Sequence, residues 1–328
     1  MSVQEAGTHR HTGTSTETDL DLVVTGREDA TEGVVVLTLA DPAGTELPPW
    51  SAGAHVDLVL APDLVRQYSL CGDPADRSAY RVGVLREPAG RGGSAAVHDR
   101  LHEGTAVHVR GPRNGFPLQP AARYLFLAGG IGITPLLSHA RAAVRWDRSF
   151  TLLYGYRPGA AAHLAELREL CGSRLHELPE LPDFLSAVES ALSSSPIGTH
   201  LYACGPAPML DGVLGRAAEL GWPEERLHTE RFSAAALDPG EPFEAVLRRS
   251  GRRVPVPSGV SLLGALEQAG VPVRSMCRQG VCGECRVGVL SGAPLHRDLF
   301  LSDEEKAADD SVMCCVSRSS DPYLELDL

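Results

Sequence analysis

Three closely spaced cysteines and a fourth one farther along the chain constrain this sequence more than any other feature. The four residues are Cys277, Cys282, Cys285 and Cys315. The first three follow the spacing C-x4-C-x2-C, which is typical of plant-type [2Fe–2S] loops. Gly280 and Gly283 stand inside the loop, where glycine lets the backbone wrap closely around a cluster. Structural zinc sites favour a C-x2-C pair at both ends, and this sequence has one at a single end. We therefore predict a [2Fe–2S] cluster bound by the four thiolates.

The length and composition predict a globular protein of several domains. The chain has 328 residues, enough for two or three cores, and 43% of its residues are hydrophobic. No apolar run is long enough to span a bilayer, and the first residues lack the apolar core of a signal peptide. The other cysteines lack the spacing of a disulfide framework; they are Cys71, Cys171, Cys204 and Cys314. We expect a cytoplasmic protein that does not associate with membranes.

The net charge of −12 excludes one broad class of function. The acidic residues are spread along the chain, and no long basic run interrupts them. Binding to nucleic acid or to an anionic membrane needs a basic patch, so we expect neither.

The sequence pattern changes twice along the chain. Residues 18–119 contain short β segments separated by Gly, Pro and Asp turns, as in an antiparallel barrel or sandwich. Residues 120–236 alternate apolar strands with helices, predicted at 135–146, 160–170 and 207–219, which indicates a parallel α/β sheet. Residues 242–328 contain a hairpin at 243–255, a short helix at 261–269 and the cysteine loop. We predict three domains over these ranges, a disordered N-terminus at 1–17 and a linker at 237–241.

Two turns of the α/β region have the character of a nucleotide site. The first follows the strand at 124–128 and reads Gly129-Gly130-Ile131-Gly132-Ile133-Thr134-Pro135. Small residues there let the backbone approach a pyrophosphate, and the helix that follows offers unpaired amides. The second, Cys204-Gly205-Pro206, ends a later parallel strand and so belongs to the same edge of the sheet. A tight strand–helix connection remains the alternative for the first turn.

Two motifs of the β region suggest a phosphate and a planar ring. In Arg66-Gln67-Tyr68-Ser69-Leu70, an arginine that can pair with phosphate stands two positions before a tyrosine that can face a ring. The segment Gly90-Arg91-Gly92-Gly93-Ser94 resembles a nest of backbone amides with a hydroxyl beside it. An ordinary half-buried strand and an ordinary surface loop remain the alternatives.

Taken in order, these motifs resemble the phthalate dioxygenase reductase (vanillate demethylase reductase) family of the ferredoxin–NADP reductase superfamily. The resemblance covers nearly the whole chain after residue 18 and extends to Cys315-Val316-Ser317-Arg318 near the end. It implies a multidomain protein with an antiparallel β-barrel flavin domain, an α/β nucleotide domain with a parallel sheet, and an α+β ferredoxin domain of the β-grasp type. It also implies three cofactors, namely FMN, NADH and the [2Fe–2S] cluster.

The resemblance assigns roles to residues of this sequence. Those implied for the flavin and its phosphate are Arg66, Tyr68, Ser69, Gly92, Gly93 and Ser94. Those implied for the nicotinamide and pyrophosphate are Gly130, Gly132, Thr134, Cys204, Gly205 and Pro206, and Phe232 would stand where the flavin meets the linker. Alignment with the family makes Cys315 the fourth cluster ligand and Cys314 a small buried residue. Tyr156-Arg157-Pro158 departs from the Arg-Ser that the family often has, which leaves the adenosine end open.

The physical logic of these cofactors agrees with the resemblance. NADH gives up two electrons together, a [2Fe–2S] cluster accepts one, and a flavin can mediate between them. We therefore predict an NADH-dependent oxidoreductase in which side chains position cofactors and none acts as a general acid or base. The expected acceptor is a Rieske-type terminal oxygenase, with a cytochrome P450 as the alternative, and we expect a monomer. An iron–sulfur redox sensor and a reductase that releases free flavin are the other classes considered.

Overall fold

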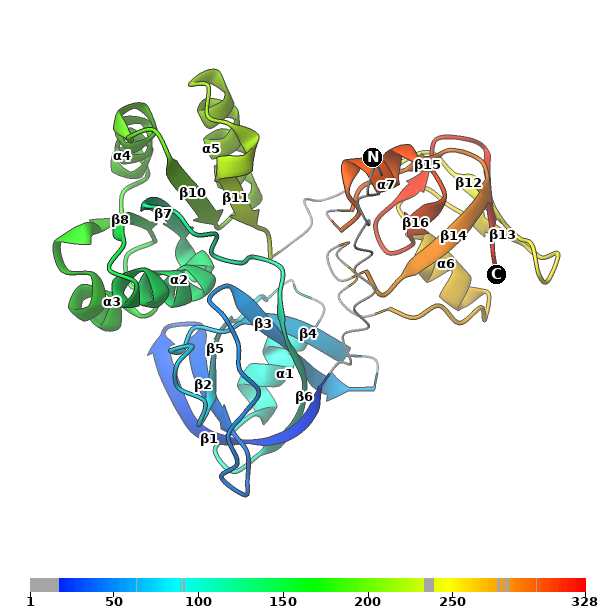
Figure 1. Cartoon of the computed structure of the whole chain (residues 1–328). Coiled ribbons are helices and arrows are strands. Elements are labelled where there is room, and N and C mark those ends of the chain that lie inside the picture. The colour runs from blue at the N-terminus through cyan, green and yellow to red at the C-terminus, as the bar shows by residue number, and fades with distance from the viewer. Residues whose placement is uncertain are drawn as a thin grey trace, which may run out of the picture.

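The structure is a computed structural model (Figure 1) that describes residues 18–62, 64–88, 90, 92–232, 239–275, 278, 280, 283–298 and 300–328. The predicted N-terminal segment 1–17 therefore lies outside the described residues, as do Cys277 and Cys282. Among the described residues, no helix has the length and apolarity needed to cross a membrane.

A six-stranded antiparallel sheet forms the first region. Its strands are β1 (Asp19–Thr31), β2 (Val34–Ala40), β3 (Ala54–Ala61), β4 (Leu64–Ser69), β5 (Tyr80–Leu85) and β6 (Ala106–Asn114). The order β4-β3-β6-β1-β2-β5 curls the sheet into a half-barrel around a core that includes Leu37, Val56 and Leu58. Helix α1 (Gly93–Arg100) packs against β3, β4 and β5, and its Val97 is buried in that core. The predicted antiparallel barrel is confirmed.

A five-stranded parallel sheet forms the second region. Its strands are β7 (Arg123–Gly129), β8 (Ser149–Gly155), β9 (Leu175–Leu178), β10 (Thr199–Cys204) and β11 (Leu227–Glu230), in the order β11-β10-β7-β8-β9. Helices α2 (Ile133–Arg145) and α3 (Leu164–Cys171) contribute to the core on one face. Helices α4 (Leu181–Ser194) and α5 (Ala207–Glu219) contribute to the core on the other. Short 3-10 turns lie at Gly130–Gly132, Gly172–Arg174 and Glu224–Arg226.

The half-barrel and the parallel sheet share one core. The cluster under α2 and α3 includes Val34, Cys71 and Phe116 from the barrel side together with Phe126 and Leu136. The two regions therefore pack directly against each other, and this contact fixes the geometry of any site between them.

The C-terminal region has its own mixed sheet and core. Strands β12 (Phe243–Leu247), β13 (Arg253–Val256), β14 (Arg286–Ser291), β16 (Ser311–Met313) and β18 (Tyr323–Leu326) are ordered β13-β12-β18-β14-β16. Strands β15 (Pro294–Leu295) and β17 (Arg318–Ser319) form a separate pair. Helix α6 (Leu262–Gln268) is capped by Ser261, and α7 (Asp303–Ala307) begins with a capping box. This arrangement has the predicted α+β character.

The helix predictions are correct in part. The predicted helix 207–219 matches α5, but the helix predicted from residue 160 begins at Leu164, because His163 adopts a left-handed backbone with φ of 59° immediately before it. The elements that were not predicted include helices α1, α4 and α7 and strands β9 and β11.

Candidate functional site

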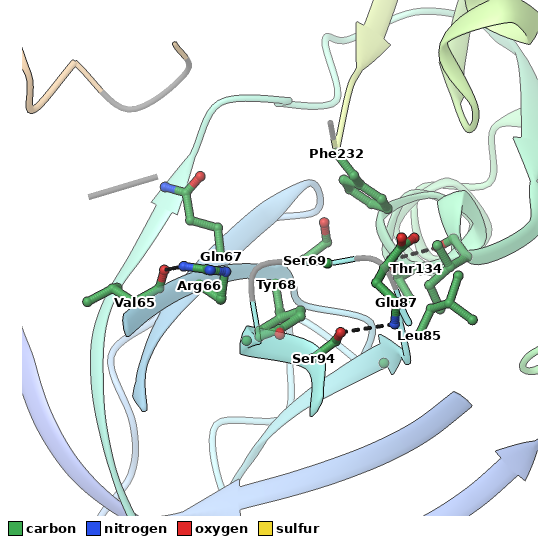
Figure 2. Close-up of a pocket in the computed structure, with 14 residues that line it drawn as sticks. Val65, Arg66, Gln67, Tyr68, Ser69, Leu85, Glu87, Ser94, Thr134 and Phe232 are labelled. Atoms are coloured by element: carbon green, nitrogen blue, oxygen red, sulfur yellow. Dashed lines mark hydrogen bonds between the residues drawn. The ribbon is translucent and has the colours of Figure 1, made fainter. Parts of the chain in front are cut away.

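A cavity of about 370 Å³ opens between the half-barrel and the parallel sheet (Figure 2). Strands β4 and β5, the starts of α1 and α2, and the residue two positions after β11 form its wall. The lining residues are Val65, Arg66, Gln67, Tyr68, Ser69, Gly83, Leu85, Glu87, Gly90, Gly93, Ser94, Ile131, Thr134 and Phe232. Motifs that are far apart in the sequence thus meet at one place.

Helix α1 presents its N-terminus to this cavity beside an arginine. Gly92 has φ of 78° and leads the chain directly into the helix, so the amides of Gly93 and Ser94 in the predicted nest belong to a helix N-terminus. The side chain of Arg66 lies over Gly93, where a Cβ atom would stand 2.6 Å from Arg66 Nε. Unpaired helix amides beside a guanidinium form a cradle suited to a phosphate.

A hydroxyl on the cavity wall pairs with a carboxyl group at the end of β11. Ser69 Oγ donates a hydrogen bond of 3.1 Å to Glu230 Oε2 at the end of β11. Burial raises the pKa of Glu230 to about 7, and the Ser69 hydrogen bond opposes that rise. Cys204, opposite Glu230 in the parallel register, is fully buried, and burial raises the pKa of its thiol. The pairing of Glu230 with Ser69 was not predicted from the sequence.

The two predicted nucleotide turns pack against each other. A Cβ atom on Gly132 would lie 2.8 Å from the backbone nitrogen of Gly205, and one on Gly205 would lie 3.0 Å from Gly129 Cα. Gly130 differs, because it has φ of 55° and nothing lies within 4 Å of its Cβ position. Gly132 and Gly205 are therefore required for close packing, whereas the Gly130 backbone is open to a ligand.

A charged network joins the half-barrel to the parallel sheet beside the cavity. Glu166 of α3 accepts a hydrogen bond from Arg81 of β5 at 3.0 Å, contacts Arg141 of α2, and lies 3.1 Å from His163 Nδ1. Burial lowers the pKa of His163, but Cys71 and Glu166 outweigh it and raise that pKa to about 9. Burial raises the pKa of Glu166, but His163, Arg81 and Arg141 lower it to about 2. No sequence motif indicated this network, because its members come from β5, α2 and the start of α3.

We expect Glu166→Gln to lower the free energy of unfolding by about 2–3 kcal/mol, because it leaves His163 and Arg81 without their anionic partner. The contribution of Glu166 is present above its unfolded pKa of 4.5 and is lost as the pH falls toward 2. The contribution of His163 to stability is present below its unfolded pKa of 6.5 and is lost as the pH rises through its folded pKa of about 9. Denaturant unfolding at pH 5.5 and pH 9.5 measures the loss of the His163 contribution, and unfolding of the wild type at pH 3 measures the loss of the Glu166 contribution.

The exposed Glu169 on the same helix provides the control. Glu169→Gln should leave the unfolding free energy within about 0.5 kcal/mol of the wild type at both pH values. A loss that is equal for Glu166→Gln and Glu169→Gln would contradict the proposed role of the network.

A second ion-pair network lies at the end of β8 and β9, where the adenosine part of a dinucleotide is expected. Tyr156 donates a hydrogen bond of 3.1 Å to Glu177, and Arg168 pairs with the same carboxylate through two contacts of 2.7 Å. The Arg168 hydrogen bonds are the largest cause that keeps the pKa of Glu177 below its usual range. At this end of the sheet, the carboxylate of Glu177 is therefore already paired with Arg168.

The predicted cluster ligands are only partly within the described residues. Cys285 and Cys315 are buried in the core of the C-terminal region, and Cys314 is fully buried beside Cys315. Around the loop, a Cβ atom on Gly280 would lie 3.0 Å from Asp298 Cα, and one on Gly283 would enter the ring of Phe300. Both glycines have positive φ, of 74° and 81°, as the close wrapping of the loop requires.

The predicted ligands of the flavin and nicotinamide divide into two groups. The cavity wall brings together Arg66, Tyr68, Ser69, Gly93, Ser94, Thr134 and Phe232. The wall does not include Gly92, Gly130, Gly132, Cys204, Gly205 or Pro206. The first group is thus spatially convergent, although its role in holding a cofactor stays a prediction.

Two family descriptions match parts of the chain. Residues 112–227 match "Dimethylamine monooxygenase subunit DmmA-like, N-terminal domain", and residues 246–320 match "2Fe-2S iron-sulfur cluster binding domain". The second match covers β14 and β16 together with all four predicted cluster cysteines.

Known proteins resemble the whole chain. A vanillate O-demethylase oxidoreductase of Pseudomonas sp. is 39% identical over 94% of this chain and 100% of its own length. The solved structure of a phthalate dioxygenase reductase, described as modular for electron transfer from pyridine nucleotides to [2Fe–2S], has a TM-score of 0.72. It is 36% identical over 94% of this chain and 98% of its own length. The solved structure of a type IV self-sufficient cytochrome P450 monooxygenase has a TM-score of 0.77 and is 38% identical over 94% of this chain. The match covers 41% of the P450 protein.

These matches confirm the predicted fold class, the [2Fe–2S] domain and the oxidoreductase activity. The chain belongs to the phthalate dioxygenase reductase (vanillate demethylase reductase) family, whose members are reductase components of oxygenase systems.

Proposed function

We propose that this protein transfers electrons from NADH to a terminal oxygenase, using FMN and a [2Fe–2S] cluster as internal carriers. The observation that carries the proposal is the cavity, whose wall brings together the Arg66 guanidinium, the start of α1 and Ser69, the partner of Glu230. The C-terminal domain with its cluster cysteines supplies the exit for electrons. FMN, when bound, accepts a hydride and releases electrons singly.

The residues of the cavity fit FMN. Arg66 and the amides at the start of α1 would hold the phosphate, and Tyr68 would lie along the ring system. Gly83 lets β5 pack closely against the start of α2, since a Cβ atom there would lie 2.9 Å from Thr134 Cγ2. Ser69 and the protonatable Glu230 would orient the reacting ring edge with a hydroxyl and a carboxyl group.

The nicotinamide would enter over the edge of the parallel sheet beside Phe232. Phe232 lines the cavity and follows β11, and its ring extends from the end of that strand toward Thr134 and Ser69 (Figure 2). Gly130 offers an open backbone for the pyrophosphate. We propose domain limits of 18–119 for FMN, 120–236 for NADH and 242–328 for the cluster, joined by a linker at 237–241.

The acceptor proposed is a Rieske-type terminal oxygenase, reached by a monomeric and cytoplasmic reductase. The relative from Pseudomonas, which is named as an oxidoreductase for O-demethylation, supports an oxygenase partner. A cytochrome P450 is the second candidate, since a self-sufficient P450 monooxygenase contains a segment similar to this chain.

One experiment tests the electron path. Anaerobic addition of NADH to the purified protein should bleach the flavin absorption and produce the EPR signal of a reduced [2Fe–2S] cluster. Reoxidation of that signal by an added Rieske oxygenase, but not by a P450, would support the preferred acceptor. Flavin bleaching without any cluster signal would contradict the proposed path.

We expect Arg66→Ala to weaken flavin retention, because the loss of a charge-assisted phosphate contact costs about 1.5–3 kcal/mol. The measurement is the molar ratio of flavin to protein after gel filtration, with the released flavin identified by chromatography as FMN. Arg77→Ala, which removes a barrel arginine outside the cavity, should retain the wild-type ratio. Recovery of FAD from the wild type would show that the cofactor assignment is wrong.

A further inference from the structure

Arg318 is a buried arginine whose contacts reach the start of the C-terminal domain. It lies on β17, three residues after the predicted ligand Cys315, and is 3% exposed. Its guanidinium donates hydrogen bonds to three backbone carbonyl oxygens, those of Val260 at 2.6 Å, Glu241 at 2.9 Å and Pro257 at 3.1 Å. Its Cζ atom lies 5.2 Å from the centre of the Phe243 ring. Such contacts offset the cost of burying a charged group.

The backbone that Arg318 holds is the described end of the interdomain segment. Gly240 has φ of 67°, and a Cβ atom there would lie 2.5 Å from Arg318 Nε and 3.0 Å from Arg297 Nη2. The amide of Gly259 donates a hydrogen bond of 2.9 Å to the carbonyl oxygen of Pro239. Residues 239–241 are therefore fixed against the turn at 257–260, with Arg318 between them and the cluster segment.

This contact determines how much chain separates the cavity from the ferredoxin domain. Phe232 lines the cavity, and Pro239 follows it by seven positions. A fully extended chain of that length spans at most about 25 Å. Without the contact, the next anchored residue would be Phe243 at the start of β12, eleven positions after Phe232. The maximum span would then be about 39 Å.

We propose that Arg318 is a positioning residue that clamps the interdomain linker to the ferredoxin domain and so keeps the cluster within short reach of the flavin site. The proposal rests on the function proposed above, since it assigns a role in transfer from flavin to cluster. By the usual −3/2 power dependence on linker length, release of the clamp should lower the effective concentration of one domain at the other about twofold. Loss of the fixed exit direction of the linker adds to this effect.

A matched pair of glycine variants tests the clamp without removing a buried charge. Gly240→Ala introduces a methyl group that collides with Arg318, whereas Gly251→Ala carries the same backbone strain, with φ of 66°, but meets nothing within 4 Å. Arg318→Met removes the clamp directly, and Arg318→Lys keeps a cation that can still donate to the carbonyl oxygens. All four are made in the full-length protein with its cofactors.

Two readouts are decisive. Hydrogen–deuterium exchange of the segment containing Gly259 should accelerate in Gly240→Ala and Arg318→Met, and remain at the wild-type rate in Gly251→Ala. Stopped-flow absorbance should show an unchanged rate of flavin reduction by NADH and an approximately twofold or greater slowing of cluster reduction. Arg318→Lys should recover part of that rate, and the midpoint potential of the cluster should stay the same in Gly240→Ala.

Wild-type exchange at Gly259 in Gly240→Ala, or equal slowing in Gly240→Ala and Gly251→Ala, would overturn the proposal. A shifted cluster potential that accounts for the slower transfer would also overturn it, since Arg318 would then act on the cluster and not on the linker. Exchange is measured without NADH, so it decides on the clamp even if the proposed electron path fails.

Discussion

Cys315→Ser should lose the [2Fe–2S] cluster and retain the flavin. A serine hydroxyl is a poor ligand for iron at neutral pH, and loss of a direct ligand should weaken cluster binding by at least about 100-fold, beyond the usual effect of an outer-shell change. The flavin cavity is formed by β4, β5, α1 and α2, none of which belongs to the C-terminal core. The variant should therefore still reduce ferricyanide with NADH but fail to reduce a one-electron protein acceptor. Iron and sulfide analysis, together with flavin content, measures the outcome.

The neighbouring Cys314 provides the control. The spacing of the cysteines alone does not show whether Cys314 or Cys315 is the fourth ligand. Cys314 is completely buried, and burial raises the pKa of its thiol, as expected for a thiol that packs in a core. Cys314→Ala should keep full iron content and lose only about 1 kcal/mol of stability. Iron loss in Cys314→Ala with retention in Cys315→Ser would reverse the assignment of the fourth ligand.

The sequence was most informative where the chemistry depends on local spacing. The β segments of the first region, the α/β alternation and the cysteine loop are all encoded in short stretches of sequence, and each region has the predicted class of fold. Helix α1 was missed because Gly90–Ser94 has the composition of a loop, and its helix begins only at Gly93 after the left-handed Gly92. Helix α4 has an apolar pattern, but Pro179 and Glu180 before it and Pro182 in its first turn look like a connection.

Contacts between distant segments were not predictable from spacing. Ser69 and Glu230 are separated by 161 positions, and they meet only because the half-barrel packs on the parallel sheet. The network of Glu166 with Arg81 and Arg141 has the same origin, since each partner comes from a different element. The close packing of Gly132 on Gly205 was likewise invisible, because a glycine required for packing has the same sequence signature as one that faces a ligand.

NADH should be preferred over NADPH by about 100-fold in kcat/KM, which corresponds to roughly 2.7 kcal/mol. A 2′-phosphate needs a cationic pocket near the ends of β8 and β9. There, Glu177 already occupies Arg168 through two hydrogen bonds of 2.7 Å and accepts a third from Tyr156. A phosphate at this place would meet a carboxylate that is only 29% exposed, and the arginine could not turn to it without breaking its pair.

Glu177→Gln should therefore raise kcat/KM for NADPH by about tenfold, because it removes the repulsion and frees Arg168, while the value for NADH changes little. Steady-state kinetics with ferricyanide as the acceptor measures both donors. The control is Glu189→Gln, which breaks a similar two-contact pair with Arg216, at 2.7 Å each, between α4 and α5. An equal gain in the control would show that overall charge, and not the position of Glu177, sets the preference. Equal use of NADH and NADPH by the wild type would indicate instead that the exposed Arg157 reads the phosphate, since that cation also lies in the segment after β8.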